Sequence, residues 1–325
     1  MLNVAFIGCG LIGDKRAKAI EGFVKIMSCY DTNENKSNAF ALKFSCDNVG
    51  NIGGIVNNKS IDVVFIATTH DSLANLAEMS LKLGKHVFIE KPGAINKFEL
   101  SRIYLLAKEK NLFVHIGYNH RYHPAVRKAI DIFNSGKIGK LLFLRARYGH
   151  GGRIGYEKEW RARKELSGGG ELIDQGTHLI DLSMAFLGEI TLDYAATPNY
   201  FWKMNVEDNA FIVVKNSSGS IGFLHASCTE WKNNFSLEVY GEIGKLEISG
   251  LGGSYGIEKL TYFKMLPEMG PPETNFWEFT DDDSWGLEVQ EFVEDIEKRN
   301  DQSSNLSSSI KVLELVHEIY ERTGR

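Results

Sequence analysis

Short apolar runs alternate with longer amphipathic segments over the first 118 residues of the chain. Strands are predicted at Asn3–Ile7, Val24–Tyr30, Val63–Ala67, His86–Ile89 and Leu112–Ile116. Helices are predicted between them at Leu11–Glu21, Asn33–Phe44, Asp71–Leu83 and Lys97–Lys110. Strands that alternate with helices of this length are typical of βαβ units on a parallel sheet with both faces covered.

The pattern changes after Pro124, where strand candidates alternate apolar and polar residues. Strands are predicted at Leu141–Tyr148, Ala210–Val214, Ser220–Ser227, Phe235–Tyr240 and Lys245–Ile248. Helices are predicted at Ala125–Phe133, Leu172–Phe186, Leu287–Lys298 and Ser308–Arg322. A period of two indicates a mainly antiparallel sheet with one face exposed or covered by a partner. We therefore predict an α/β chain with one domain over 1–118 and a second over 119–325.

Composition agrees with two ordinary globular domains. The chain has 325 residues, a formal net charge of −5 and 43% hydrophobic residues, so we expect neither disorder nor a nucleic-acid or membrane partner. No apolar run reaches the ~18 residues of a membrane span, and the N-terminus lacks the features of a signal peptide. The four cysteines, at positions 9, 29, 46 and 228, have no metal-ligand spacing, so we predict no metal and a cytoplasmic protein with reduced thiols.

Glycine is the unusual component, with 32 residues, or roughly 10% against a typical ~7%. The first cluster, Gly8-Cys9-Gly10-Leu11-Ile12-Gly13, fits the G-x-G-x-x-G pattern between a predicted strand and a predicted helix. Such a loop lets the backbone approach a pyrophosphate at the helix N-terminus. The cofactor-binding residues predicted from it are Gly8, Gly10, Leu11, Ile12 and Gly13.

Asp31 ends the second predicted strand, where a dinucleotide-binding domain carries an acidic residue for the ribose hydroxyls. A carboxylate at this position would repel a 2′-phosphate, so NAD is predicted in preference to NADP. The structural alternative is a helix cap in an α/β domain that binds no nucleotide.

Two further motifs carry candidate chemistry. Lys91, in Glu90-Lys91-Pro92, follows a predicted parallel strand, and open α/β sheets bind ligands at that end of their strands. Asp174 and His178 lie four residues apart after the glycine run 168–170, which predicts that they share one helix face. Each has a structural alternative, a strand-end lysine in one case and a buried, satisfied histidine in the other.

These motifs together resemble the glucose–fructose oxidoreductase / inositol 2-dehydrogenase (Gfo/Idh/MocA) family. The resemblance rests on the N-terminal fingerprint, Gly84–Pro92, Gly117–Pro124, the triple glycine and Asp174–His178. It implies an N-terminal Rossmann domain and a C-terminal domain with an open sheet, commonly used to form a homodimer or homotetramer. It also implies NAD(P)-dependent oxidation or reduction of a sugar or cyclitol hydroxyl. The segment 67–73 departs from the family pattern because it lacks the usual proline and ends in Leu73 where histidine is usual.

The resemblance implies a catalytic set of Lys91, Asp174 and His178. His178 would take the hydroxyl proton, Asp174 would orient His178 or bind substrate, and Lys91 would stabilise the developing alkoxide. Further cofactor contacts are predicted at Thr68, Thr69, His70, Glu90, Lys91, Trp160 and Arg161. Substrate contacts are predicted at Lys91, Tyr118, Asn119, Arg121, Tyr148, Arg153, Tyr156, Asp174 and His178, with His123 nearby.

The substrate prediction rests on a basic segment, 145–164, with interleaved aromatic residues. Arginine forks bind phosphate or carboxylate, which favours an anionic sugar, such as a nucleotide-linked sugar of a surface-polysaccharide pathway. The segment is equally compatible with a solvated loop or a dimer contact. Alternatives for the whole chain are an inositol or free-sugar dehydrogenase, an NAD-dependent glycosidase and a non-catalytic NAD-binding regulator.

Overall fold

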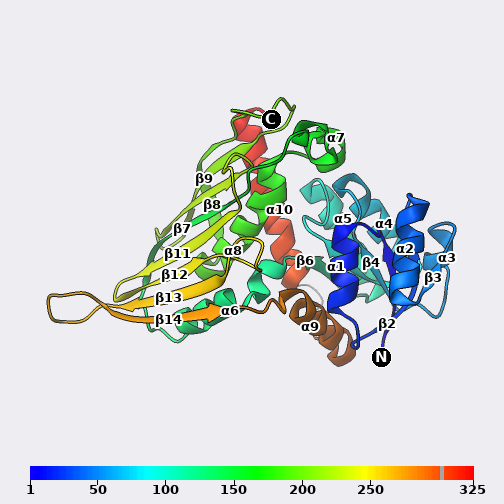
Figure 1. Cartoon of the computed structure of the whole chain (residues 1–325), viewed down its shortest axis with the longest axis horizontal. Helices are drawn as coiled ribbons and strands as arrows, with labels where there is room; N and C mark the ends of the chain where they lie inside the picture. The colour runs from blue at the N-terminus through cyan, green and yellow to red at the C-terminus, as the bar shows by residue number, and fades with distance from the viewer. Residues whose placement is uncertain (301–303) are drawn as a thin grey trace. The chain divides into compact units, whose positions relative to one another are not determined.

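The computed structural model describes residues 1–300 and 304–325, which form two compact units (Figure 1). The first unit contains Met1–Tyr118 and Trp285–Leu313, and the second contains Asn119–Ser284 and Glu314–Arg325. The predicted second domain included residues 285–313, whereas the structure packs them with the first unit. In the part of the chain that the structure describes, no helix is both long enough and apolar enough to cross a membrane.

The first unit is built on a six-stranded parallel sheet with the order β3-β2-β1-β4-β5-β6. The strands are β1 (Asn3–Ile7), β2 (Lys25–Tyr30), β3 (Asp47–Asn48), β4 (Val63–Ile66), β5 (His86–Glu90) and β6 (Val114–Gly117). The helices are α1 (Leu11–Ala19), α2 (Glu34–Phe44), α3 (Gly53–Val56), α4 (His70–Lys82) and α5 (Lys97–Lys110). This strand order confirms the predicted doubly wound domain, and its switch point lies between β1 and β4. The short elements β3 and α3 were not predicted.

Aromatic rings form a ladder across the central strands of this sheet. The ring of Phe65 stacks on Phe6 at 4.9 Å and on Phe88 at 5.0 Å between centroids. Helix α9 (Ser284–Lys298) covers this ladder, because the edge of its Phe292 ring packs on Phe88 at 5.6 Å. The late segment of the chain thus completes the core of the first unit.

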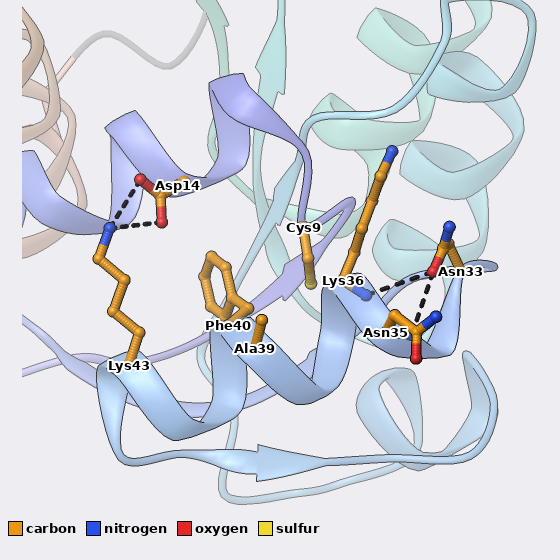
Figure 2. Close-up of a pocket in the computed structure, with 8 residues that line it drawn as sticks. All are labelled: Cys9, Asp14, Asn33, Asn35, Lys36, Ala39, Phe40 and Lys43. Atoms are coloured by element: carbon orange, nitrogen blue, oxygen red, sulfur yellow. Dashed lines mark hydrogen bonds and ion pairs between the residues drawn. The ribbon is translucent and has the colours of Figure 1, made fainter.

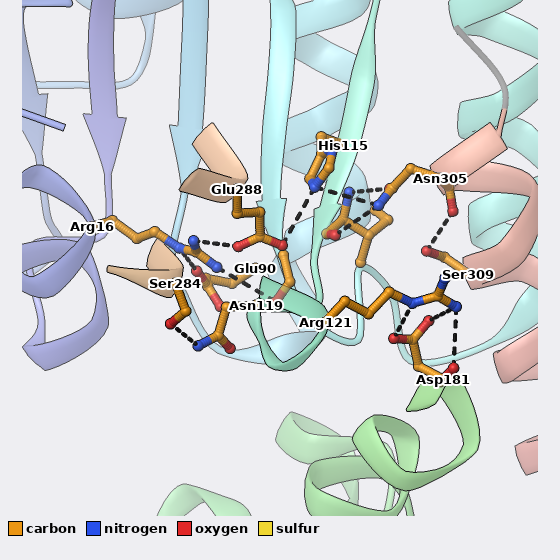
Figure 3. Close-up of polar contacts among 12 residues, drawn as sticks. Arg16, Glu90, His115, Asn119, Arg121, Asp181, Ser284, Glu288, Asn305 and Ser309 are labelled. Atoms are coloured by element: carbon orange, nitrogen blue, oxygen red, sulfur yellow. Dashed lines mark hydrogen bonds and ion pairs between the residues drawn. The ribbon is translucent and has the colours of Figure 1, made fainter. Parts of the chain in front are cut away.

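A buried charge cluster joins three elements of the first unit (Figure 3). The Arg16 side chain on α1 is 1% exposed, and its guanidinium pairs with Glu90 at the end of β5 and with Glu288 on α9. The guanidinium carbon lies 4.6 Å from the Phe88 ring centroid and 4.3 Å from that of Trp285. Two carboxylates and two aromatic faces therefore surround one buried cation.

The second unit contains an eight-stranded sheet with the order β14-β13-β12-β11-β7-β10-β9-β8. Its strands are β7 (Leu141–Gly149), β8 (Ile190–Ala196), β9 (Asn209–Asn216), β10 (Ile221–Ser227), β11 (Asn234–Gly241), β12 (Gly244–Ser249), β13 (Glu258–Lys264) and β14 (Glu273–Phe279). Neighbouring strands are antiparallel except for the β7–β10 pair, which confirms the predicted mainly antiparallel sheet. Strands β8, β13 and β14 were not predicted.

The longer helices of the second unit are α6 (Pro124–Asn134), α8 (Thr177–Leu187) and the second half of α10 (Ser304–Thr323). Its short helical elements are η1 (Asn119–Tyr122), η2 (Tyr156–Lys158), η3 (Trp160–Ala162), α7 (Lys164–Ser167) and the π-helical η4 (Leu172–Gly176). Helix α6 contacts β12–β14, and α8 contacts β7 and β10. These contacts define the inner face of the sheet.

Strand β7 shows how the sheet separates its side chains. Tyr148 belongs to the buried set of the strand, whereas Arg145 and Arg147 alternate with it and are exposed. On the outer face the Phe143 ring stacks on Tyr240 at 4.2 Å. Because successive residues of a strand point to opposite faces, Arg145 and Arg147 face away from Tyr148.

We expect Arg16→Met to lower the free energy of unfolding by about 3–5 kcal/mol, because it leaves two buried carboxylates without their cation. Urea unfolding at pH 8 measures this loss. Lys43→Met is the matched control, since its ion pair with Asp14 is exposed and should contribute less than about 1 kcal/mol. Equal losses in the two variants would contradict this account of the cluster.

Candidate active site

The glycine fingerprint connects β1 to α1, and glycine is favoured at each of its three positions for a different structural reason. Gly8 has a φ of +99°, and a Cβ there would lie 2.4 Å from the carbonyl oxygen of Ala67. A Cβ on Gly13 would lie 2.1 Å from the carbonyl oxygen of Gly8, so this glycine allows close packing of helix and strand. A Cβ on Gly10 would meet no atom within 4 Å. Gly10 therefore leaves open space at the N-cap of α1, as a pyrophosphate requires.

Asp31 follows β2 and connects two loops. Its Oδ2 accepts the backbone N–H of Cys9 at 2.8 Å, and its Oδ1 accepts that of Asn33 at 2.8 Å. A carboxylate has about four acceptor sites, so each oxygen can still accept another hydrogen bond. The carboxylate thus organises the fingerprint loop and retains the capacity to bind ribose hydroxyls.

A pocket of about 310 Å³ lies beside this loop, between α1 and α2 (Figure 2). It is lined by Cys9, Asp14, Asn33, Asn35, Lys36, Ala39, Phe40 and Lys43. The Asn33 side chain caps α2 by accepting the backbone N–H groups of Asn35 and Lys36. The lining combines the apolar groups of Ala39 and Phe40 with amide, ammonium and carboxylate groups, a mixture that suits a nucleoside. None of its α2 residues was among the predicted site residues.

The segment after β4 lies at the switch point of the sheet. Thr69 precedes α4, and Ser72 in its first turn donates to Thr68 Oγ1 at 2.7 Å. His70 is the first residue of α4 and is 4% exposed. The predicted cofactor contacts of Thr68, Thr69 and His70 stay predictions, but these residues stand where a doubly wound sheet binds its ligand.

The end of β5 carries a buried ion pair. The predicted cofactor contact of Glu90 stays a prediction, and its buried carboxylate pairs with Arg16 inside the domain. Glu90 therefore anchors the end of the strand. Lys91 follows it directly and is partly buried at the carboxyl end of the parallel sheet.

In the second unit, two residues of the triple glycine allow close approach of other parts of the chain. A Cβ on Gly169 would lie 1.9 Å from the Tyr320 hydroxyl oxygen, and one on Gly170 would lie 2.0 Å from the Glu207 carbonyl oxygen. Glu207 Oε1 accepts the N–H groups of Gly170 and Leu172 at 3.0 and 3.1 Å, and the Tyr320 hydroxyl at 2.8 Å. Close internal packing therefore accounts for glycine at positions 169 and 170.

Asp174 and His178 occupy different types of helix. Asp174 lies in the π-helical turn η4, whereas His178 lies in the first turn of α8, so the predicted single α-helical face is interrupted by a wider turn. Asp174 is 7% exposed, and its Oδ2 accepts from Arg161 Nε at 2.9 Å. The ring of Trp160 lies 4.5 Å from the Arg161 guanidinium carbon. The structure thus places Arg161, predicted as a cofactor contact, on the Asp174 carboxylate.

His178 lies in a cluster of aromatic rings. Its imidazole is 4% exposed and stacks on that of His120, with centroids 3.7 Å apart and planes 15° apart. The Tyr148 ring lies edge-on to both, 4.9 Å from His120 and 5.9 Å from His178. Sequence reasoning missed His120, although it stands between two residues predicted to bind substrate.

Glu171 is the second residue that sequence reasoning missed. It is 1% exposed, and its Oε1 accepts the Tyr156 hydroxyl at 2.9 Å and lies 3.7 Å from His150 Nε2. Burial, and secondarily the Asp174 charge, raise the pKa of Glu171 to about 8. At neutral pH this carboxyl group therefore retains a proton. The Tyr156 hydroxyl donates to Glu171, and the predicted contact of Tyr156 with substrate stays a prediction.

Several predicted substrate residues have partners within the second unit. Arg121 forms a bidentate pair with Asp181, with both N–O distances 2.7 Å (Figure 3). Asn119 Nδ2 lies 3.3 Å from Ser284 Oγ. Arg153 is exposed and pairs with Glu159 at 2.7 Å. Within the basic segment, Arg153 is thus paired with a carboxylate, and Arg145 and Arg147 face outward from the sheet.

Tyr118 is the last residue of the N-terminal part of the first unit and is 2% exposed. Its predicted contact with substrate stays a prediction.

We expect Glu171→Gln to be more stable than the wild type at pH 9 and nearly equal to it at pH 5. A folded-state pKa of about 8 against an unfolded value of 4.5 means that the wild type loses stability as pH rises across this window. Glutamine keeps the acceptor for Tyr156 but has no proton to lose. Denaturant unfolding at pH 5, 7 and 9 measures the difference, with the exposed Glu165→Gln as control. The same pH dependence in both variants would contradict the raised pKa.

Comparisons with known proteins agree with this geometry. The chain is 25% identical over 285 residues to a levoglucosan dehydrogenase of Pseudarthrobacter phenanthrenivorans, covering 75% of this chain and 73% of the relative. It is 24% identical over 314 residues to an inositol 2-dehydrogenase of Rhizobium meliloti, covering 91% and 89%. A solved levoglucosan dehydrogenase in complex with NADH has the same fold, with a TM-score of 0.91 at 21% identity over 99% of this chain and 97% of that one.

Family models match both units. Residues 2–118 match the oxidoreductase family with an NAD-binding Rossmann fold, and residues 126–247 match the GFO/IDH/MocA C-terminal domain. The chain is therefore a member of the GFO/IDH/MocA family of oxidoreductases, and its first unit is an NAD-binding domain.

Proposed function

We propose that this protein is an NAD-dependent oxidoreductase that oxidises a secondary hydroxyl of a sugar or cyclitol, or reduces the corresponding ketone. The observation that carries the proposal is the fingerprint loop, where Gly10 leaves open space and Asp31 keeps acceptor capacity. The second unit adds a buried histidine and carboxylate on adjoining turns. Relatives named as levoglucosan and inositol dehydrogenases support the same reaction class.

We further propose that Lys91, Asp174 and His178 act on one substrate hydroxyl. When bound, NAD+ supplies the hydride acceptor. His178 accepts the hydroxyl proton, because an imidazole titrates near neutral pH. The Lys91 ammonium donates to the reacting oxygen and stabilises its developing negative charge. Asp174, held by Arg161 at 2.9 Å, keeps a fixed carboxylate for orienting His178 or a substrate hydroxyl.

The charge pattern supports an uncharged substrate in preference to the nucleotide-linked sugar expected from the basic segment. Arg161, Arg121 and Arg153 each pair with a carboxylate of their own unit. Buried Glu171, beside Asp174, adds a hydrogen-bonding carboxyl group and no positive charge. Neutral polyols need hydrogen-bond partners and not a net positive site, so we propose a free sugar or cyclitol.

The function is tested by assaying free sugars, cyclitols and nucleotide-linked sugars with NAD and NADP, following formation of the reduced cofactor. We expect turnover of an uncharged sugar or cyclitol with NAD. His178→Asn should lower kcat about 10²–10⁴-fold. Binding of NADH, measured by its fluorescence, should be unchanged because the fingerprint loop is intact.

Four outcomes would count against parts of the proposal. Wild-type turnover in His178→Asn would remove the histidine from the reaction. Turnover of nucleotide-linked sugars alone would support an anionic substrate and contradict the proposed uncharged one. Glycan release without net formation of NADH would identify a glycosidase, and tight NADH binding without turnover of any sugar would identify a regulator.

We also propose that a second copy of this chain covers the outer face of the eight-stranded sheet. Large apolar side chains are exposed there on adjacent strands, with Phe143 38%, Ile221 49%, Phe223 45% and Tyr194 57% exposed. Contiguous exposed apolar side chains of this kind mark association surfaces. The family resemblance supports the same assembly, as a homodimer or homotetramer.

We expect the double variant Phe143→Arg/Phe223→Arg to be monomeric, because it places two charges in the proposed interface. Light scattering coupled to size exclusion gives the mass of each species, and Leu42→Arg, exposed on α2, is the control. A monomeric wild type, or an assembly that survives the double substitution, would contradict this interface.

A further inference from the structure

His120 lies in the 3-10 helix η1 and has no role in the proposed reaction, yet it makes the shortest ring contact with His178. The two imidazoles stack nearly parallel, with centroids 3.7 Å apart, and His120 is 5% exposed. The edge of the Tyr148 ring packs on His120 at 4.9 Å. His120 therefore covers one flat face of the His178 ring, so the two rings restrict each other's rotation.

A second histidine of the same segment, His123, packs against the His120 ring. The ring of His123 lies 5.6 Å from that of His120, at 72°. His123 Nδ1 lies 3.0 Å from Glu258 Oε2, and Glu258 Oε1 accepts the backbone N–H of Ala125 at 2.7 Å. Glu258 thus fixes both the His123 ring and the start of α6.

The late glycine cluster at 250–256 takes part in the same support. It forms the turn between β12 and β13, directly before Glu258. A Cβ on Gly252 would lie 3.1 Å from His123 Cε1. The backbone of this turn therefore packs against His123, and this close approach favours glycine at position 252.

We propose that His120 is a positioning residue for His178, and that the Glu258–His123 pair holds it in place. This inference rests on the proposed role of His178 as the base. A base transfers a proton efficiently only when its ring nitrogen is held in line with the donor. A flat ring on one face prevents tilting of the imidazole, and its π electrons attract the imidazolium that forms.

The test compares His120→Leu with His120→Phe. Leucine fills the volume without a flat face, whereas phenylalanine retains a stacking ring. We expect His120→Leu to lower kcat about three- to tenfold, with KM and NADH binding unchanged, and His120→Phe to recover most of the loss. The solvent deuterium isotope effect on kcat should rise in His120→Leu, because the proton transfer then limits turnover.

His225→Leu is the matched control, because that imidazole also stacks on a ring, Phe211 at 4.3 Å, but on the outer face of the sheet. It should leave kcat unchanged. Wild-type kcat in His120→Leu, together with an inactive His178→Asn, would overturn this inference and leave the proposed function intact. Equal losses in His120→Leu and His120→Phe that follow their melting temperatures would show a structural role only and would also overturn it. An active His178→Asn would overturn the proposed role of the base itself.

Discussion

The buried guanidinium of Arg16 is the interaction on which the first unit depends. It joins the helix that follows the glycine fingerprint, the strand end that precedes Lys91, and a helix from the late part of the chain. A cation without water must have anionic partners, so each of these three elements constrains the other two. The Phe88 and Trp285 rings exclude solvent above and below the cation. The cofactor loop and the candidate lysine are thereby attached to one rigid centre.

In the second unit, close backbone approach and buried carboxylates hold the elements of the candidate site in place. Glu207 binds the backbone at the start of the π-helical turn, and this requires Gly170 because no Cβ fits beside it. The same turn then carries Glu171 and Asp174, two acids that differ in environment. Asp174 has the Arg161 cation, whereas Glu171 is buried against the Tyr156 hydroxyl and has a raised pKa.

Much of the fold could be predicted because buried parallel strands and alternating antiparallel strands have distinct periods. Strand β14 was missed because none of its residues is buried, whereas β13 was missed although Leu260 and Tyr262 alternate with polar residues. The same period of two predicts that Arg145 and Arg147 point away from the face that carries Tyr148, because they lie an odd number of residues from it. The number of basic residues in the segment does not carry this information.

The site could be predicted only where a short motif carried it. Asp174, His178 and the fingerprint glycines were found from spacing, whereas His120 and Glu171 depend on contacts between distant elements. From the sequence, a glutamate next to glycines is expected to be exposed, whereas Glu171 is buried and binds the Tyr156 hydroxyl. Arg16 likewise looks like an ordinary helix surface residue, because its partner Glu288 lies far along the chain.

The discontinuity of the first unit affects how the chain acquires its structure during synthesis. Residues 1–118 are translated before the second unit, but Glu288 and Phe292 belong to the same core and emerge only after the entire eight-stranded sheet has been translated. Until then Arg16 lacks one of its two counter-charges, and the Phe88 ring lacks its cover. The nascent first unit thus keeps an incomplete interior while the whole sheet of the second unit is synthesised.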